Sequence, residues 1–312
     1  MSYAVVLGEA LVDLLEETVD DEFVYRQAIG GAPLNVAVAA ARLGGDVQFV
    51  GTLGSDTLGD RIAALLHRVG VGTGALRRVA VPSALAVATF DGAEPTFQFY
   101  GEPPSYALLE PADVDPTLIA DAAIIYAGSI SLMREPFLSA ARAAWRIAGP
   151  VRVFDPNIRP LLLPDAAAVA SLRDVVEEFF ATADLVKISA ADAEVLYGAA
   201  SPSATAERIH RIGARNVVVT SGAKGAYVAT ADGTSMLPAP EVAAIDATGA
   251  GDSVMGALVR RLLADGIPVD LDGWQHNVRF ALAVAGLVCE RQGGAVAMPT
   301  QEELTARWGD LS

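Results

Sequence analysis

The sequence predicts an α/β protein in which a mostly parallel sheet is covered by helices on both faces. Short apolar segments alternate with longer amphipathic ones through the second half of the chain, at 124–126, 135–148, 151–154, 165–181, 184–188 and 216–220. Strands that alternate with helices form parallel sheets buried on both sides. Hydrophobic residues make up 52% of the 312 residues, which is enough for a large core. We expect one domain over 1–312.

Turn residues and apolar runs define the other elements. Pro33 suits the first turn of a helix, and Gly44 with Gly45 suits its end. On the same reasoning we expect short helices up to about residue 212. The further elements expected are strands at 3–7, 47–50, 73–79 and 225–230 and helices at 33–43, 57–69, 250–264, 274–289 and 300–307.

Two segments interrupt this pattern with short alternating pieces and predict a small separate β-sheet. The first, 9–28, carries acidic turns, and the second, 84–105, contains two strand-like runs, 84–90 and 95–100. We expect them to form a lid. Because lid strands have exposed edges, pairing across a two-fold axis would protect them, and we expect a homodimer.

The charge balance excludes several classes of partner. The chain has 22 Lys and Arg against 38 Asp and Glu, a formal net charge of −16. Proteins that bind nucleic acid or an anionic membrane cluster basic residues, so neither partner is expected. A single pocket can still bind ATP. No apolar run approaches the roughly 18 residues of a membrane span, and the N-terminus has no basic region typical of a signal peptide, so we expect a cytoplasmic protein.

Few residues are available for zinc or histidine chemistry. Cys289 is the only cysteine, and only three histidines occur, with no two at metal-ligand spacing. A zinc site built from cysteines and a histidine-dependent hydrolase are therefore unexpected.

A glycine-rich loop, 246–252, leads directly into the amphipathic segment 250–264. The start of a helix favours anions, and Gly249 and Gly251 let the backbone approach a ligand closely. Asp252 would lie in the first turn, where it could accept a proton from an alcohol while the loop amides hold a phosphoryl group. Alternatively, the loop is an ordinary turn and Asp252 only complements the helix dipole. The Walker A pattern is absent.

A second polar segment, 30–35, precedes the helix at 33–43. Asn35 offers donors and an acceptor near the helix start, which suits recognition of sugar hydroxyls. Asp13 could accept two hydroxyl hydrogen bonds. Taken alone, each residue fits an ordinary structural role better, Asn35 as a cap or core amide and Asp13 as a turn acid.

These two segments together resemble the signatures of the PfkB carbohydrate kinases, the family of ribokinase, adenosine kinase and bacterial fructokinases. Segment 30–37, with Gly44, Gly51 and Gly54, resembles the N-terminal signature. Segment 246–258, over 200 residues later, resembles the C-terminal one. The resemblance covers nearly the whole chain. It implies a ribokinase-like three-layer α/β/α domain with a β-sheet lid, and transfer of the γ-phosphoryl group of ATP to a sugar hydroxyl with Mg²⁺.

The resemblance also implies roles for individual residues. Asp252 takes the place of the catalytic base, and the amides of Gly249, Ala250 and Gly251 take that of the anion hole. Residues in the place of sugar ligands are Asp13, Gly31, Asn35 and, on the lid, Phe99. Segment 155–159 resembles a DPNxR motif whose arginine, Arg159, meets ATP phosphates. It is alternatively a turn that follows a strand.

The nucleotide side is implied by a late loop and by a motif that departs from the family. Thr220, Gly222, Lys224 and Gly225 resemble the loop that faces adenosine. Many relatives carry an Asn-x-x-Glu motif near the metal. Its positions here, beside Lys187, are held by Ser189 and Asp192, so Asp192 either reaches Mg²⁺ through water or lies on the surface. Asp246, with carbonyls at 289–294, is implied as a K⁺ site.

The choice of sugar is less constrained. Segment 7–13, the lid strand with Phe99 and the DPNxR segment resemble fructokinases, which favours a neutral ketohexose such as fructose. The stretch 84–105 contains no arginine, which disfavours an acidic or phosphorylated sugar, although Arg26 or Arg159 could hold a carboxylate. Kinases for 2-keto-3-deoxygluconate, ribose or a nucleoside remain alternatives, as does a non-catalytic sensor. A nicotinamide oxidoreductase is disfavoured by the misplaced glycine pattern. Lys187 and Lys224 are the only lysines, and both fall in segments assigned to the nucleotide.

Overall fold

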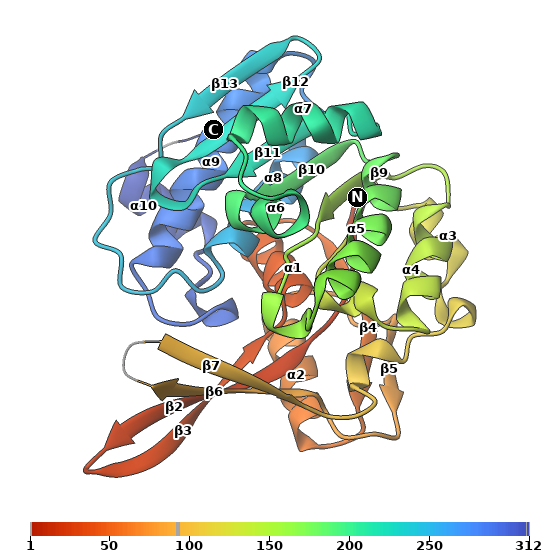
Figure 1. Ribbon diagram of the computed structural model, residues 1–312, viewed down its shortest axis with the longest axis vertical. Coiled ribbons are helices and arrows are strands. Elements are labelled where there is room, and N and C mark those ends of the chain that lie inside the picture. Colours follow the sequence, from red (N-terminus) through yellow and green to blue (C-terminus); the bar gives the residue numbers. More distant parts are fainter. Residues whose placement is uncertain (1, 92–93, 310, 312) are drawn as a thin grey trace.

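The computed structural model describes residues 2–91, 94–309 and 311, and these form three layers with a smaller sheet beside them (Figure 1). Within the described residues, the central sheet has nine strands. All neighbours are parallel except β12 with β11 and β13. In spatial order they are β13 (Gly233–Leu237), β12 (Ala226–Thr230), β11 (Asn216–Thr220), β10 (Leu185–Ser189), β9 (Val151–Asp155), β8 (Ile124–Gly128), β1 (Ala4–Leu7), β4 (Val47–Gly54) and β5 (Leu76–Val79). The predicted fold class is confirmed.

Helices cover both faces of this sheet, and each layer has its own apolar core. On one face lie α1 (Ala32–Arg42), α2 (Thr57–Arg68), α8 (Ala250–Asp265), α9 (Leu271–Cys289) and α10 (Gln301–Trp308). On the other face lie α3 (Pro116–Ala120), α4 (Phe137–Trp145), α5 (Ala166–Phe180), α6 (Ala190–Tyr197) and α7 (Pro202–Ile212). Strands buried on both sides are expected to be apolar throughout, as the fully buried β1 is.

The second sheet contains the two segments that interrupt the helix–strand alternation. Its order is β3 (Glu22–Gly30), β2 (Leu11–Val19), β6 (Leu85–Asp91) and β7 (Glu94–Tyr100). β2 pairs in antiparallel fashion with β3 and in parallel with β6. The predicted small separate sheet is therefore present, and β3 extends two residues beyond the predicted segment. Residues 92 and 93 of that prediction lie outside the described residues.

The structure adds elements that the sequence analysis missed. β13 was not expected, because its alternating polar residues lie in a short segment rich in turn residues. Helix α3 is only five residues long. Helix α9 begins three residues earlier than predicted, since the Asp270 side chain accepts a hydrogen bond from the Gly273 amide and caps it. Across the described ranges, no helix is both long enough and apolar enough to cross a membrane.

Candidate active site

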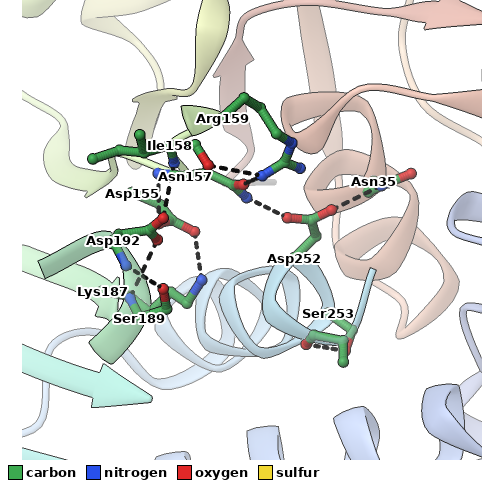
Figure 2. Close-up of polar contacts among 11 residues, drawn as sticks. Asn35, Asp155, Asn157, Ile158, Arg159, Lys187, Ser189, Asp192, Asp252 and Ser253 are labelled. Atoms are coloured by element: carbon green, nitrogen blue, oxygen red, sulfur yellow. Dashed lines mark hydrogen bonds and ion pairs between the residues drawn. The ribbon is translucent and has the colours of Figure 1, made fainter. Parts of the chain in front are cut away.

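Polar residues gather where neighbouring strands of the central sheet end. Asp155, Ser189 and Thr220 end β9, β10 and β11, Ser129 directly follows β8, and Glu9 comes two residues after β1. In open α/β sheets, ligands bind at the carboxyl ends of the strands. Helix α8 begins at this same edge and brings Asp252 to it (Figure 2). This edge of the sheet is the candidate active site.

The Asp252 carboxylate is buried, with 4% of the residue exposed, and is held by two side-chain amides (Figure 2). Asn35 Nδ2 donates to Oδ2 at 2.8 Å, and Asn157 Nδ2 donates to Oδ1 at 2.6 Å. Asn35 comes from α1 and Asn157 from the loop after β9. Because both carboxylate oxygens accept hydrogen bonds, the orientation of the group is fixed. An ionised carboxylate in this position can take a proton from a substrate.

The residues of the predicted anion site lie at the first turn of α8. Gly249 is the N-cap with a φ of 80°, and a Cβ there would lie 3.1 Å from Met298 Cε and 3.2 Å from Gly294 Cα. A side chain at this left-handed and crowded position would be strained, and glycine avoids that strain. The Ala250 amide donates to the Ala247 carbonyl at 3.1 Å, so this amide of the predicted three is engaged within the loop. The helix end and its dipole remain directed at the site.

The predicted sugar ligands line one cavity of about 210 Å³ between the lid and the central sheet. Asp13 and Phe99 reach it from the lid, whereas Gly31, Asn35 and Asp252 reach it from the helical layer. The structure therefore brings together five residues that lie up to 239 residues apart in the sequence.

Glu9 is a cavity residue that the sequence analysis did not select. It lines the same cavity although it is only 1% exposed, and its Oε2 accepts a hydrogen bond from the Ser131 amide at 3.3 Å. Burial raises the pKa of Glu9, against hydrogen bonds from Ser129 and Ser131 that lower it. Its place two residues after a buried strand was the only signal in the sequence, and that place does not show that the acid is buried. Burial likewise raises the pKa of Asp13 to about 6, although the Arg159 charge lowers it.

A second, larger cavity of about 690 Å³ lies at the ends of β10 and β11. Four residues assigned to the nucleotide line it: Ser189, Thr220, Gly222 and Lys224. Gly225 serves the turn instead. Its φ is 94°, and a Cβ there would lie 1.9 Å from the Leu237 carbonyl oxygen. Met236, on the unexpected strand β13, completes an apolar part of the wall.

The two lysines lie in different environments. Lys187 is only 2% exposed, and its Nζ forms an ion pair with Asp155 Oδ2 at 2.8 Å (Figure 2). Burial acts to lower the pKa of Lys187, but the charges of Asp155, Asp192 and Asp252 raise it overall, so the ammonium keeps its proton. A Cβ on Gly251 would lie 3.1 Å from Nζ, so this charge sits against the first turn of α8.

The two carboxylates considered as metal ligands are engaged by backbone amides. Asp192 accepts from Ile158 N at 3.1 Å and Ser189 N at 3.4 Å (Figure 2). Asp246 accepts from Thr248 N at 2.8 Å and Gly293 N at 2.9 Å. These bonds lower the pKa of Asp246 although partial burial raises it. In the part of the chain that the structure describes, no cluster of three or more His, Cys, Asp or Glu side chains suits a metal ion.

Arg159 lines the cavity of about 210 Å³ and donates through Nη1 to Asn157 Oδ1 and to the Ile158 carbonyl, the latter at 3.3 Å. The Asn157 side chain therefore lies between this guanidinium and the Asp252 carboxylate, and is hydrogen-bonded to both. Asn157 was interpreted only as part of a turn, and the structure shows that its side chain also joins these two groups (Figure 2).

Comparisons with known proteins show the family of the chain. Residues 1–301 match the pfkB family carbohydrate kinases. The chain is 35% identical to fructokinase-1 of Oryza sativa subsp. japonica over 96% of its own length and 95% of that protein's. It superposes on the fructokinase of Xylella fastidiosa with bound ATP, with a TM-score of 0.89, 31% identity and 97% of each chain covered.

The fructokinase of Vibrio cholerae O395, solved in a form with bound fructose, ADP and calcium ion, gives a TM-score of 0.85 with 30% identity and 98% of each chain covered. The family match spans both predicted signatures and the strands between them. The chain therefore belongs to the pfkB family of carbohydrate kinases.

Proposed function

We propose that this protein is an ATP-dependent fructokinase, with Asp252 as the catalytic base. One observation carries the proposal: a buried carboxylate, held at both oxygens, lies in the first turn of α8 and lines a cavity of about 210 Å³. A base, an anion-binding helix end and a small polar cavity are the parts that phosphoryl transfer to a sugar requires.

The reaction follows from these positions. Asp252 takes the proton of a sugar hydroxyl as its oxygen attacks the γ-phosphorus of ATP. The bond from that phosphorus to the oxygen bridging to the β-phosphate breaks, and ADP leaves with the electron pair. The amides of Gly249 and Gly251, the α8 dipole and the Arg159 guanidinium stabilise the charge on the transferred group. Ala250 joins the anion hole only if its amide leaves the Ala247 carbonyl.

Mg²⁺ fits the site chiefly as an ion bound to the phosphates. It normally binds one or two carboxylates together with substrate phosphates and keeps several waters. Both oxygens of Asp192 already accept backbone hydrogen bonds, which leaves it a contact through water. The ion would neutralise phosphate charge. K⁺ fits Asp246, whose carboxylate is ionised and joins the Thr248 and Gly293 loops beside the anion hole.

The charges in the sugar cavity favour a neutral substrate. Four carboxyl groups line it, those of Glu9, Asp13, Asp246 and Asp252, together with the Arg159 guanidinium. Arg26, the other basic residue considered, forms an ion pair with Glu17 on the lid. Hydroxyl groups can donate to these carboxylates, whereas a sugar acid would meet like charges. This supports fructose over 2-keto-3-deoxygluconate.

A homodimer formed through the lid completes the proposal. β3 and β7 are the edge strands of the lid sheet. Large apolar side chains on the lid are exposed, among them Phe23 at 74% and Tyr25 at 48%. Exposed apolar surface of this kind marks a contact with another molecule, and a second lid would cover it.

A panel of neutral sugars, sugar acids and nucleosides, assayed with ATP and Mg²⁺ by ADP release, tests the substrate. We expect fructose to give the highest kcat/KM. A preference for a sugar acid or a nucleoside would overturn the assignment of fructose, and ADP release that no acceptor raises above background would overturn the kinase itself.

A further inference from the structure

We propose that Asn157 is a positioning residue that joins the phosphate-facing Arg159 to the catalytic carboxylate of Asp252. This inference rests on the proposed function, because it assigns Asp252 the task of accepting a proton. It goes beyond the interpretation of the segment as a turn with an arginine.

The hydrogen bonds of Asn157 have only one consistent direction. A guanidinium can donate but not accept, so the atom that faces Arg159 Nη1 must be the amide oxygen. The amide nitrogen then faces Asp252 Oδ1, at 2.6 Å, and donates to it. The result is a chain of donors from the guanidinium through the amide to the carboxylate (Figure 2). Consecutive hydrogen bonds of this kind strengthen one another in a buried site.

The surrounding segment fixes Asn157 in place. The backbone N–H of Asn157 donates to Asp155 Oδ1 at 3.3 Å, and Asp155 is itself paired with Lys187. The next residue, Ile158, donates its amide to Asp192. Asn157 has a φ of 39°, which is uncommon for a residue other than glycine and is tolerated best by Asn and Asp. Asn157 is 7% exposed, and its side chain points at Asp252 on α8, which is 95 residues later in the chain.

A turn alone does not require this contact. Asn-rich turns are stabilised by bonds to nearby backbone groups. The Asn157 side chain instead reaches a carboxylate and a guanidinium, the two groups to which the proposed reaction assigns proton transfer and phosphate charge. Together with Asn35 it fixes both oxygens of Asp252. Losing its donor leaves the Asp252 carboxylate less well oriented.

Two substitutions distinguish the role of the Asn157 side chain from that of its backbone conformation. Asn157→Asp keeps the shape, the favoured backbone conformation and an acceptor for Arg159, but places a second carboxylate against Asp252. Asn157→Gly removes both contacts and accommodates the φ of 39° without strain. Asn277→Asp makes the same change at a buried asparagine of α9 whose Oδ1 accepts from Arg261 Nε at 3.1 Å, and serves as the matched control.

Two readouts are measured for each variant, with thermal unfolding to verify folding. The first is the pH dependence of kcat and KM with fructose and ATP. The second is the titration of the Asp252 carboxyl carbon by ¹³C NMR in the unliganded protein, assigned by the signal lost in Asp252→Asn. The second readout does not depend on turnover, so it decides the role of Asn157 even if no sugar is phosphorylated.

We expect Asn157→Asp to move the NMR midpoint and the acid limb of kcat to higher pH by about one unit or more, because like charges retain a proton. Asn157→Gly should lower kcat by about 10²-fold with a smaller change in KM for fructose, as misplaced catalytic groups do. Asn277→Asp should leave both profiles unchanged. An unshifted Asp252 titration in both Asn157 variants would overturn the proposal, while absent turnover in the wild type would overturn only the proposed function.

Discussion

The two cavities of this protein are built in different ways. The sugar cavity is bordered by buried polar side chains that hold one another, such as Asn35, Asp252 and Asn157. The nucleotide cavity is wider and is walled by short loops and small residues at the ends of β10 and β11. The chemistry needs fixed groups where bonds change, whereas the nucleotide needs mainly space and backbone contacts. Substitutions on the sugar side should therefore have the larger effects.

The largest effect is expected at Asp252. Replacing it by asparagine keeps the volume and removes the proton acceptor. We expect kcat to fall by about 10²-fold or more while sugar and ATP still bind. Steady-state rates with calorimetric binding of each ligand test this. Wild-type turnover in Asp252→Asn would remove the residue from its role.

Substituting the two lysines compares a buried ion pair, at Lys187, with the lining of the larger cavity, at Lys224. Lys187→Arg places a larger planar group where Gly251 and Asp155 already crowd the ammonium, so we expect a loss of about 1–3 kcal/mol in unfolding free energy together with reduced kcat. Lys224→Arg, at the rim of the wide cavity, should change the KM for ATP by about twofold or less. Equal effects would mean that the two environments do not differ functionally.

The pH dependence of sugar binding tests the lid. Burial raises the pKa of Asp13 to about 6, so its carboxylate is protonated progressively as the pH falls below that value. A protonated Asp13 is a poorer acceptor for sugar hydroxyls, and we expect the KM for fructose to rise between pH 7 and pH 5. Asp13→Asn should have a higher KM that no longer changes over this range. A variant that retains the wild-type rise would assign it to another group.

The raised pKa of Asp13 also makes the folding stability depend on pH. Stability falls as the pH rises, whereas sugar binding is expected to improve. An acid whose pKa is raised on folding binds its proton more tightly in the folded state. Its contribution to stability is therefore greatest below its unfolded value of 3.8 and is lost as the pH rises to about 6. Asp13→Asn should be relatively more stable than the wild type at pH 7, and chemical denaturation at pH 4 and pH 7 measures the difference.

The smallest catalytic effect is expected on the outer face of the lid. Phe23 and Tyr25 are exposed there, away from the reacting groups. We expect the wild type to be a dimer at micromolar concentration by light scattering, and Phe23→Ser with Tyr25→Ser to shift it toward the monomer while kcat changes only slightly. A monomeric wild type would contradict the proposed dimer.

The sequence predicted most of the fold because each element has a strong local signal. Apolar runs located the strands of the parallel sheet, and Pro33 and Gly44 bounded α1 within a residue or two. β13 was missed because its pairing with β12 is a tertiary contact with no local equivalent. The lid was predicted from its alternation, although its parallel pairing of β2 with β6 was not.

Site residues were predicted where they belong to a recognisable sequence motif. They were missed where only the folded structure brings them to the site. Asn35 and Asp252 were selected from the signatures and Asp13 from the wider family resemblance, and all three line the cavity of about 210 Å³. Glu9 was missed because burial of an acid cannot be read from one sequence. Asn157 was missed because its partner is 95 residues away, so that turn chemistry explained it sufficiently.

The central claim is that this site transfers the γ-phosphoryl group of ATP to a sugar hydroxyl and not to water. Time-resolved ³¹P NMR of the protein with ATP, Mg²⁺ and fructose follows every phosphorus atom directly. We predict that the γ-phosphate signal is replaced by one phosphomonoester signal that grows in step with ADP. Formation of inorganic phosphate in its place, or an unchanged ATP spectrum, would contradict the account.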